Sequence, residues 1–274
     1  MLDLYNKTTL ECSKLITEHY STSFTLGIKT LDKKLHFPIY AIYGFVRYAD
    51  EIVDTFYDFN QRFLFDKFKA DTFEAIKDKI SLNPVLHSFQ LMVNQYNIEH
   101  ELINAFLHSM EMDLKESEYN QAGYEEYIYG SAEVVGLMCL RVFCDGNFEQ
   151  YNQLRTGAKR LGAAFQKVNF LRDVKSDFED RGRVYFPNVD FTNFLQKDKE
   201  SIEADIQADF DAAYIAIKQL PISARKGVYL AYIYYVTLFN KIKAVPANMV
   251  QEERIRVPDF QKIILLCKTY LTGV

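Results

Sequence analysis

Apolar residues recur at helical spacing along most of the chain, and no run of alternating polar and apolar residues predicts a β-sheet. Six prolines and eleven glycines punctuate this pattern. Pro38, Pro84 and Pro221 each suit the first turn of a helix, where the missing N–H of proline costs little. We therefore expect an all-α protein. The pattern predicts helices at residues 3–30, 38–57, 60–78, 84–95, 99–118, 122–144, 149–179, 198–219, 222–244 and 259–271.

One segment, from Asp180 to Phe194, interrupts the helical pattern with Gly182 and Pro187. It predicts a structured loop after a long helix, and a loop of this length inside a compact domain is often functional. No glycine-rich linker, low-complexity tract or repeat divides the chain. Because 274 residues are enough to bury a sizeable core, we expect a single domain over residues 1–274.

Charge and cysteine content narrow the class of protein. The net charge is −5 and basic residues form no cluster, so we expect no nucleic-acid partner. The four cysteines lack the spacing of a metal site and are typical of reduced thiols in a cytoplasmic protein. The longest uncharged stretch, Gly227 to Asn240, is shorter than the about 20 apolar residues that cross a membrane. We therefore expect a core helix there.

The first candidate site is a pair of aspartates four residues apart, Asp50 and Asp54, which share one face of a predicted helix with Arg47. Two like charges at this spacing destabilise a bare helix by about 0.2–0.5 kcal/mol. A divalent cation between them turns the repulsion into a binding site, because hard cations prefer carboxylate oxygens. Acidic pairs are also common on solvated helix faces, so this pair alone does not establish a metal site.

A second pair, Asp173 and Asp177, repeats the spacing, and Gln166 and Asn169 extend the same stripe toward the N-terminus. The other sides of this helix are mostly apolar, which favours a stripe that faces an internal hydrated cavity over one that faces bulk water. Arginines follow closely in the sequence, and a guanidinium group binds phosphate oxygens in a bidentate manner. Two acidic pairs with nearby arginines therefore predict a site for Mg²⁺-bound diphosphate.

These residues resemble known signatures. The run Leu161-Gly162, Gln166, Asn169, Arg172-Asp173, Asp177, Arg183, Tyr185 and Pro187 resembles the second signature of the squalene/phytoene synthase family. Asp50 to Asp54 is similar to its first aspartate-rich motif, and Tyr127 to Val142 to another signature, although Ile128 and Glu133 replace small residues. Ser21 to Phe24, Tyr235 and Arg254 to Pro258 also resemble family elements. The resemblance extends over about residues 12–262.

The resemblance implies a fold and a reaction. The fold would be an isoprenoid-synthase-type helical bundle around a central cavity, with the two aspartate-rich helices facing each other at its mouth. The reaction would join two prenyl diphosphates head to head through a cyclopropyl diphosphate. The implied cofactor is Mg²⁺, which Mn²⁺ can replace, and NADPH is not expected.

The resemblance also implies roles for individual residues. The implied metal ligands are Asp50, Asp54, Asn169, Asp173 and Asp177. The implied catalytic residues are the four aspartates and Tyr127. The implied substrate-binding residues are Phe24, Tyr43, Arg47, Gln166, Asn169, Arg172, Arg183, Tyr185 and Tyr235. The aromatic faces among them suit a carbocation, which is attracted to a ring face.

Three readings of the function stay open. We favour the conversion of geranylgeranyl diphosphate to phytoene in carotenoid biosynthesis. The alternatives are a dehydrosqualene or squalene synthase that acts on farnesyl diphosphate, and a non-catalytic relative that serves as an assembly factor. Because the hydrocarbon product would be insoluble in water, we also expect a transient, peripheral contact with a membrane.

Overall fold

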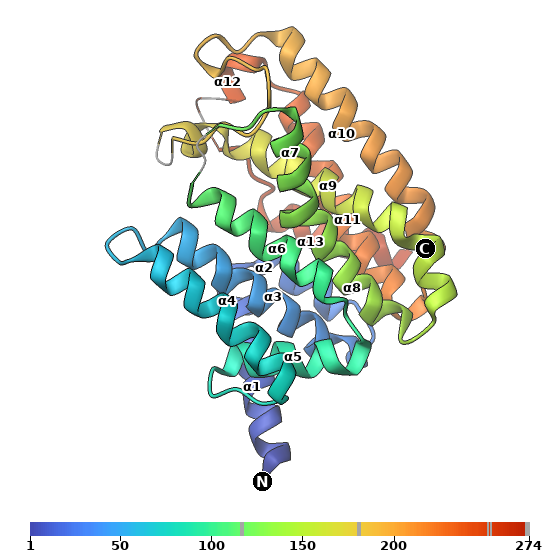
Figure 1. Ribbon diagram of the computed structural model, residues 1–274. Coiled ribbons are helices and arrows are strands. Elements are labelled where there is room, and N and C mark those ends of the chain that lie inside the picture. Colours follow the sequence, from blue (N-terminus) through green and yellow to red (C-terminus); the bar gives the residue numbers. More distant parts are fainter. Residues whose placement is uncertain (116–117, 180–181, 251, 253, 272–274) are drawn as a thin grey trace.

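The computed structural model describes residues 1–115, 118–179, 182–250, 252 and 254–271, and Figure 1 shows their arrangement as a bundle of helices. The described residues contain no β-strand, only one isolated parallel bridge between Glu118 and Val184. The prediction of an all-α protein is therefore confirmed. The helices in chain order are α1 (Leu2–Tyr20), α2 (Thr22–Lys29), α3 (Lys33–Asp54), α4 (Gln61–Asp78), α5 (Pro84–Tyr96), α6 (His100–Asp113), α7 (Gln121–Ile128), η1 (Tyr129–Glu133), α8 (Val134–Cys144), α9 (Phe148–Glu179), η2 (Phe191–Asn193), α10 (Gln196–Ile217), α11 (Ile222–Lys243), α12 (Ala247–Val250) and α13 (Asp259–Leu271).

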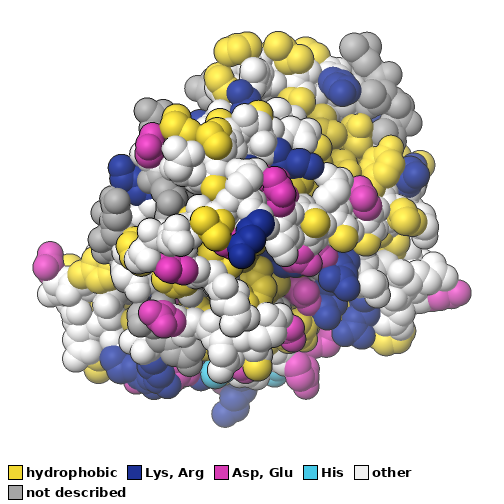
Figure 2. Space-filling view, turned by 90° about the horizontal axis from the view of Figure 1, so that it is seen from above, with side chains coloured by type: hydrophobic (Ala, Val, Ile, Leu, Met, Phe, Trp, Pro, Cys, Tyr) yellow, Lys and Arg dark blue, Asp and Glu magenta, His cyan; other side chains and the backbone are white. Residues whose placement is uncertain are grey.

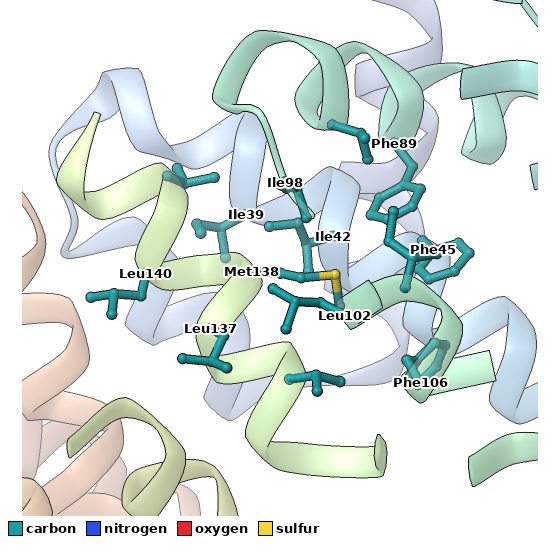
Figure 3. Packing of buried hydrophobic residues seen from close by; sticks show 14 of the residues in the cluster. Ile39, Ile42, Phe45, Phe89, Ile98, Leu102, Phe106, Leu137, Met138 and Leu140 are labelled. Atoms are coloured by element: carbon teal, nitrogen blue, oxygen red, sulfur yellow. The ribbon is translucent and has the colours of Figure 1, made fainter. Parts of the chain in front are cut away.

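Two hydrophobic clusters hold the bundle together. The larger one joins α3, α5, α6 and α8, and in Figure 3 Met138 of α8 lies close to Ile42 of α3 and Leu102 of α6. The smaller one joins α9, α10, α11 and the segment between α9 and α10. The 32-residue α9 packs against both α8 and α10, so it connects the two halves of the molecule. The second aspartate pair lies on the part of α9 that belongs to the smaller cluster, next to Val174.

Ion pairs reinforce the contact between α9 and α10. The buried Lys167 ammonium lies 2.7 Å from Asp209, and the Arg160 guanidinium lies 2.9 Å from the same carboxylate. A buried charge is tolerated when it is paired, so the ion pairs of Asp209 with Lys167 and Arg160 fix α10 along α9.

Figure 2 looks onto the end of the molecule where α10 and α12 lie in Figure 1. It shows hydrophobic, basic and acidic side chains interspersed on that face.

The prediction of one helix at 3–30 is wrong, because this segment forms two helices, α1 and α2. Ser21 between them adopts an extended conformation with φ −148°, and its hydroxyl accepts a hydrogen bond of 3.2 Å from the N–H of Phe24. A serine at this position satisfies an N–H group that would otherwise lack a partner at the start of a helix. The break directs Phe24 toward the interior cavity.

Two other predicted boundaries need correction. The third helix begins at Lys33 rather than residue 38, because the Asp32 carboxylate accepts a hydrogen bond of 3.1 Å from the N–H of Lys34. Pro38 therefore lies inside α3, where it removes one intrahelical hydrogen bond. The helix predicted to end at 118 ends at Asp113, where hydrogen bonds between residues three apart, of the 3-10 type, tighten the last turn.

The remaining helix starts agree better with the prolines that mark them. Pro84 occupies the first turn of α5, as predicted, and Pro221 lies one residue before the first turn of α11. The four-residue α12 has no counterpart in the prediction. In the predicted loop between 180 and 194, the described residues include the short 3-10 turn η2.

The predicted helix at 122–144 is continuous but contains one π-helical turn, η1. This turn packs against α6 and α9, and the approach to α9 is so close that a Cβ on Gly162 would lie 2.5 Å from the carbonyl oxygen of Ala132. The two departures from the family signature are accommodated here. Ile128 is buried in the smaller cluster, and Glu133 forms a 2.9 Å ion pair with Lys159. π-Helical turns are frequent at functional sites.

Among the described residues, one helical stretch, Gln121–Cys144, is long and apolar enough to cross a membrane. It is not the stretch that the sequence singled out, Gly227 to Asn240. Its apolar window is 56% buried inside the molecule, and Leu137 and Met138 contribute to the larger cluster (Figure 3). We therefore interpret it as a core helix.

Candidate active site

A cavity of about 250 Å³ lies between α2, α3, η1, α8, α9, α10 and α11. Its walls are almost entirely apolar, and the side chain of Gln166 is one of the few polar groups that reach it. Along α9 the lining extends from Gln166 to Leu154. Because an α-helix rises about 1.5 Å per residue, the twelve residue steps between them extend about 18 Å along α9. The cavity therefore suits a long apolar chain with a polar group at one end.

On the α3 side of the polar end, Arg47 organises the first motif. Its guanidinium group pairs with Glu51 and lies 4.0 Å from the Asp50 carboxylate. The same group lies 4.4 Å from the centroid of the Tyr20 ring, a cation–π contact that holds it in place. The predicted proximity of Arg47 and Asp50 on one helix face is confirmed by this contact.

On the α9 side, the Asp173 carboxylate pairs with the guanidinium groups of two arginines. The neighbouring Arg172 donates to it from Nε at 2.9 Å, and Arg254 approaches from the C-terminal segment with Nε at 2.8 Å. Asp177, one turn later, is buried. The sequence associated Arg172 with this motif, and the structure adds Arg254 as a second cation.

The side chain of Arg183 connects the two motifs. Its backbone N–H donates to the carbonyl of Asp177 at 2.8 Å, and its guanidinium donates to Asp54 at 2.7 Å. The same guanidinium donates to the carbonyl of Val53 at 3.2 Å. The end of the first motif and the end of the second therefore lie at the same end of the bundle. This bridge requires the two aspartate-rich helices to lie near each other, which is the arrangement that the family resemblance implied.

A buried carboxylate, Asp113, lies behind this bridge and was missed by the sequence analysis. Tyr127 donates to it at 2.6 Å, Tyr119 at 3.0 Å and Tyr185 at 3.3 Å, while Arg183 lies 3.7 Å away. Burial raises the pKa of Asp113 to about 6, against the opposing effect of the Arg183 guanidinium. Burial likewise raises the pKa of Tyr127. Of the predicted residues, Tyr127 and Tyr185 thus lie in a buried network rather than in the cavity wall.

The signal for Asp113 was present in the sequence. It follows Phe106 and Met110 at helical spacing, and all three are buried on one face of α6. A single acid in an apolar stripe marks a buried, hydrogen-bonded carboxylate, because an unpaired one would be too costly to bury.

Aromatic rings line the junction between the cavity and the aspartates. Phe24 stacks on Tyr43 at 5.0 Å, and Phe165 stacks on Tyr235 at 3.9 Å. The hydroxyl of Tyr235 donates to Asn169 at 3.3 Å. Burial raises the pKa of Tyr43 to about 12, and the nearby Arg47 opposes this shift. Of this group, Phe24 and Phe165 contact the cavity directly.

The carboxylates at this end are of the type that hard divalent cations prefer. Among the described residues, however, no three Asp, Glu, Cys or His side chains come together in a way that could hold a metal ion. Arginines neutralise two of the aspartates, with Arg183 on Asp54 and both Arg172 and Arg254 on Asp173. The carboxylate donors are of a type that fits a divalent cation, and in this structure guanidinium groups occupy two of them.

Comparison with known proteins decides the family. The family model described as squalene/phytoene synthase matches residues 17–261. The chain belongs to the squalene/phytoene synthase family. This confirms the resemblance that the motifs indicated. Members of the family are prenyltransferase-type synthases, so the chain is an enzyme of this type that condenses prenyl diphosphates head to head.

The relatives that are similar in sequence carry different names. A 4,4'-diapophytoene synthase from Staphylococcus haemolyticus is 24% identical over 71% of this chain and 67% of its own length. Phytoene synthase 1 from Solanum lycopersicum is 24% identical over 94% of this chain and 66% of its own. A bifunctional lycopene cyclase/phytoene synthase from Leptosphaeria maculans is 26% identical, and the chain spans about half of its length.

Solved structures bear out the fold. The structure of a dehydrosqualene synthase with a bound ligand has a TM-score of 0.83 and 22% identity, and the match covers 98% of both chains. A squalene synthase from Alicyclobacillus acidocaldarius has a TM-score of 0.77 and 16% identity over 88% of this chain and 95% of its own. At these identities the likeness concerns the fold, not the substrate.

Proposed function

We propose that this enzyme converts two molecules of geranylgeranyl diphosphate to phytoene, with Mg²⁺ and without NADPH, as a step of carotenoid biosynthesis. The length of the cavity lining along α9 carries the proposal. An extended isoprenoid chain advances about 1.3 Å per main-chain bond, so a C20 chain spans about 19 Å and a C15 chain about 14 Å. The lining extends about 18 Å along α9, which matches the longer chain.

The runner-up is condensation of farnesyl diphosphate to dehydrosqualene. The names of two similar proteins, a 4,4'-diapophytoene synthase and a dehydrosqualene synthase, favour it. A C15 chain would leave the end of the cavity near Leu154 without contacts, and apolar atoms that lose neighbours lose dispersion energy. This argument supports the C20 substrate over the C15 one.

The residues at the polar end have complementary proposed roles. Arg47, Arg172 and Arg254 bind diphosphate oxygens, since a guanidinium group matches phosphate in charge and geometry. The pairs Asp50/Asp54 and Asp173/Asp177, with Asn169, would hold Mg²⁺. The metal would stabilise the negative charge of the leaving diphosphate. Gln166 and Asn169 orient the substrates at the mouth of the cavity.

The aromatic junction suits the cationic steps of the proposed reaction. Loss of the first diphosphate gives an allylic cation, which attacks the C2–C3 double bond of the second substrate. Loss of a proton gives a cyclopropyl diphosphate, and departure of the second diphosphate starts a rearrangement that ends with loss of another proton. The ring faces of Phe24, Tyr43, Phe165 and Tyr235 stabilise positive charge, and the dry wall excludes water.

Tyr127, Tyr185 and Arg183 act from behind the cavity wall in this proposal. They share the Asp113 carboxylate, and Arg183 in turn donates to Asp54. We assign these residues the role of fixing the position of the first motif relative to the second. Loss of the Tyr127 hydroxyl removes the 2.6 Å hydrogen bond to Oδ2 of Asp113, and a buried polar atom that loses its hydrogen bond costs about 1–3 kcal/mol.

Product analysis tests the proposal. The enzyme is incubated with Mg²⁺ and either the C15 or the C20 diphosphate, with and without NADPH, and the hydrocarbons are identified by mass spectrometry. We expect a C40 hydrocarbon from the C20 substrate and no change of mass with NADPH. Exclusive formation of a C30 product would overturn the substrate assignment, and a reduced product would overturn the cofactor assignment.

We further propose that the enzyme resides in the cytoplasm and contacts a membrane reversibly, because its substrates and product are lipids.

A further inference from the structure

The last helix, α13, is apolar on two opposite faces. Its inner side chains Leu265 and Leu266 pack against the larger hydrophobic cluster. Its outer side chains Phe260, Ile263 and Ile264 are 61%, 59% and 58% exposed. These positions follow the i, i+3, i+4 spacing of a single helix face, so they form a continuous stripe. Isolated exposed apolar residues are ordinary on protein surfaces, whereas a stripe of this kind marks an interaction surface.

The stripe lies over one wall of the cavity. Helix α13 packs against α11, and the Lys262 ammonium donates to the hydroxyl of Thr22 at 3.2 Å, at the first residue of α2. Helices α2 and α11 contribute Gly27 and Gly227 to the cavity lining and touch each other there. The inner face of α13 therefore covers the outside of the α2–α11 wall, and its outer stripe points away from it.

The charge around the stripe has the opposite sign to that of the whole protein. The chain carries a net charge of −5, but residues 256–268 contain Arg256, Lys262 and Lys268 against the single acid Asp259. Arg256 and Lys268 are exposed. A basic segment in an acidic protein is attracted to an anionic surface, and this attraction weakens with salt.

We infer that the outer stripe of α13 docks on an anionic lipid bilayer. A helix with an apolar face and basic flanks lies in the plane of the bilayer interface with that face buried about 5–10 Å deep. A bilayer is favoured over a protein partner because the substrate and product are lipids, and to that extent the inference rests on the proposed function. Docking through α13 holds the α2–α11 wall of the cavity next to the lipid.

Sedimentation with vesicles tests the inference. The full chain is mixed with neutral phosphatidylcholine vesicles or with vesicles that also contain phosphatidylglycerol, at low and high salt. We expect wild type to bind the anionic vesicles, and to bind less at high salt. The triple variant Phe260→Ser/Ile263→Ser/Ile264→Ser should bind at least about tenfold more weakly, because its apolar stripe is removed.

A matched control removes three exposed aliphatic side chains from elements outside α13. The variant Leu4→Ser/Leu82→Ser/Ile215→Ser changes side chains that are 70%, 94% and 60% exposed, and it should bind vesicles as wild type does. Both variants should keep the far-ultraviolet circular dichroism spectrum and the melting temperature of wild type within a few degrees. Equal binding by wild type and the α13 variant, or an equal loss in the control, would overturn the inference.

Two further measurements separate this inference from other accounts. Light scattering after size-exclusion chromatography reports the oligomeric state. If wild type forms a dimer that only the α13 variant loses, and wild type does not bind vesicles, the stripe binds a second copy of the chain. That result would overturn docking on lipid. Hydrocarbon synthesis from detergent-dispersed substrate should be equal in wild type and both variants. If wild type binds vesicles through α13 but makes no hydrocarbon, the proposed function fails and the docking surface stands.

Discussion

Replacing Asp173 by asparagine separates its proposed role in catalysis from its role in the fold. The carboxylate pairs with Arg172 and, at 2.8 Å, with Arg254. The Arg254 side chain is 52% exposed, so that ion pair contributes about 0–1 kcal/mol. Arg172 is more buried, and the amide oxygen of asparagine can still accept one of its hydrogen bonds. Relief of the repulsion from Asp177 offsets part of the loss.

The expected loss of stability is therefore about 1–2 kcal/mol, which lowers the melting temperature by about 2–8 °C. The expected loss of activity is much larger. A unit charge at about 4 Å from a cation is worth about 4 kcal/mol at an effective dielectric constant of 20. Because each 1.36 kcal/mol changes a rate about tenfold, and solvent weakens the interaction, we expect about a hundredfold or greater loss of turnover.

Two assays on two variants decide the matter. Melting temperature and Mg²⁺-dependent diphosphate release are measured for Asp173→Asn and for a control, Asp58→Asn. The control also replaces an aspartate by asparagine, but at an exposed residue. The Asp58 variant should match wild type in both, since substitutions at exposed positions stay within about 0.5 kcal/mol. The reasoning is refuted if Asp173→Asn turns over within a few-fold of wild type, or if it does not fold.

Three other changes have expected outcomes. Saturating Mg²⁺ with a non-hydrolysable diphosphate analogue should raise the melting temperature by about 5–10 °C, because a ligand at a hundred times its Kd stabilises the folded state by about 2.7 kcal/mol; no shift in differential scanning fluorimetry would count against the site. Cys139→Phe fills part of the cavity that Cys139 lines and should lower turnover of the C20 substrate at least about tenfold relative to turnover of the C15 substrate, whereas Cys139→Ser should alter neither in competition assays. The pKa of Asp113 is raised to about 6 in the folded protein, so ionisation of this carboxyl group destabilises the fold. The melting temperature of wild type should therefore fall relative to that of Asp113→Asn as the pH rises from about 4 to 6. A difference between the two melting temperatures that is constant with pH would contradict this.

The sequence predicted those parts of the site that depend on local geometry. The spacing of Asp50 and Asp54, and of Asp173 and Asp177, is set by the helix itself, so their shared faces follow from the pattern alone. The break at Ser21 was also within reach, because Ser21 is a preferred residue at a helix start. It was missed because the hydrophobic pattern continues across it.

The contacts that join distant parts of the chain could not be predicted from spacing. Arg254 reaches Asp173 across 81 residues, and Arg183 reaches Asp54 across 129. Such contacts depend on how whole helices pack, and a single sequence carries no periodic signal for them. The Asp113 network belongs to the same class, since it gathers side chains from α6, α7 and the segment after α9.

The stoichiometry of diphosphate release tests the central claim most directly. In the proposed reaction each hydrocarbon molecule forms with the loss of two diphosphates, one at each ionisation. Diphosphate and hydrocarbon are measured in the same reaction with geranylgeranyl diphosphate, with Mg²⁺ present or chelated. We predict a ratio of two, and no release of either without the metal. A ratio of one, or diphosphate release without any hydrocarbon, would contradict head-to-head condensation by this enzyme.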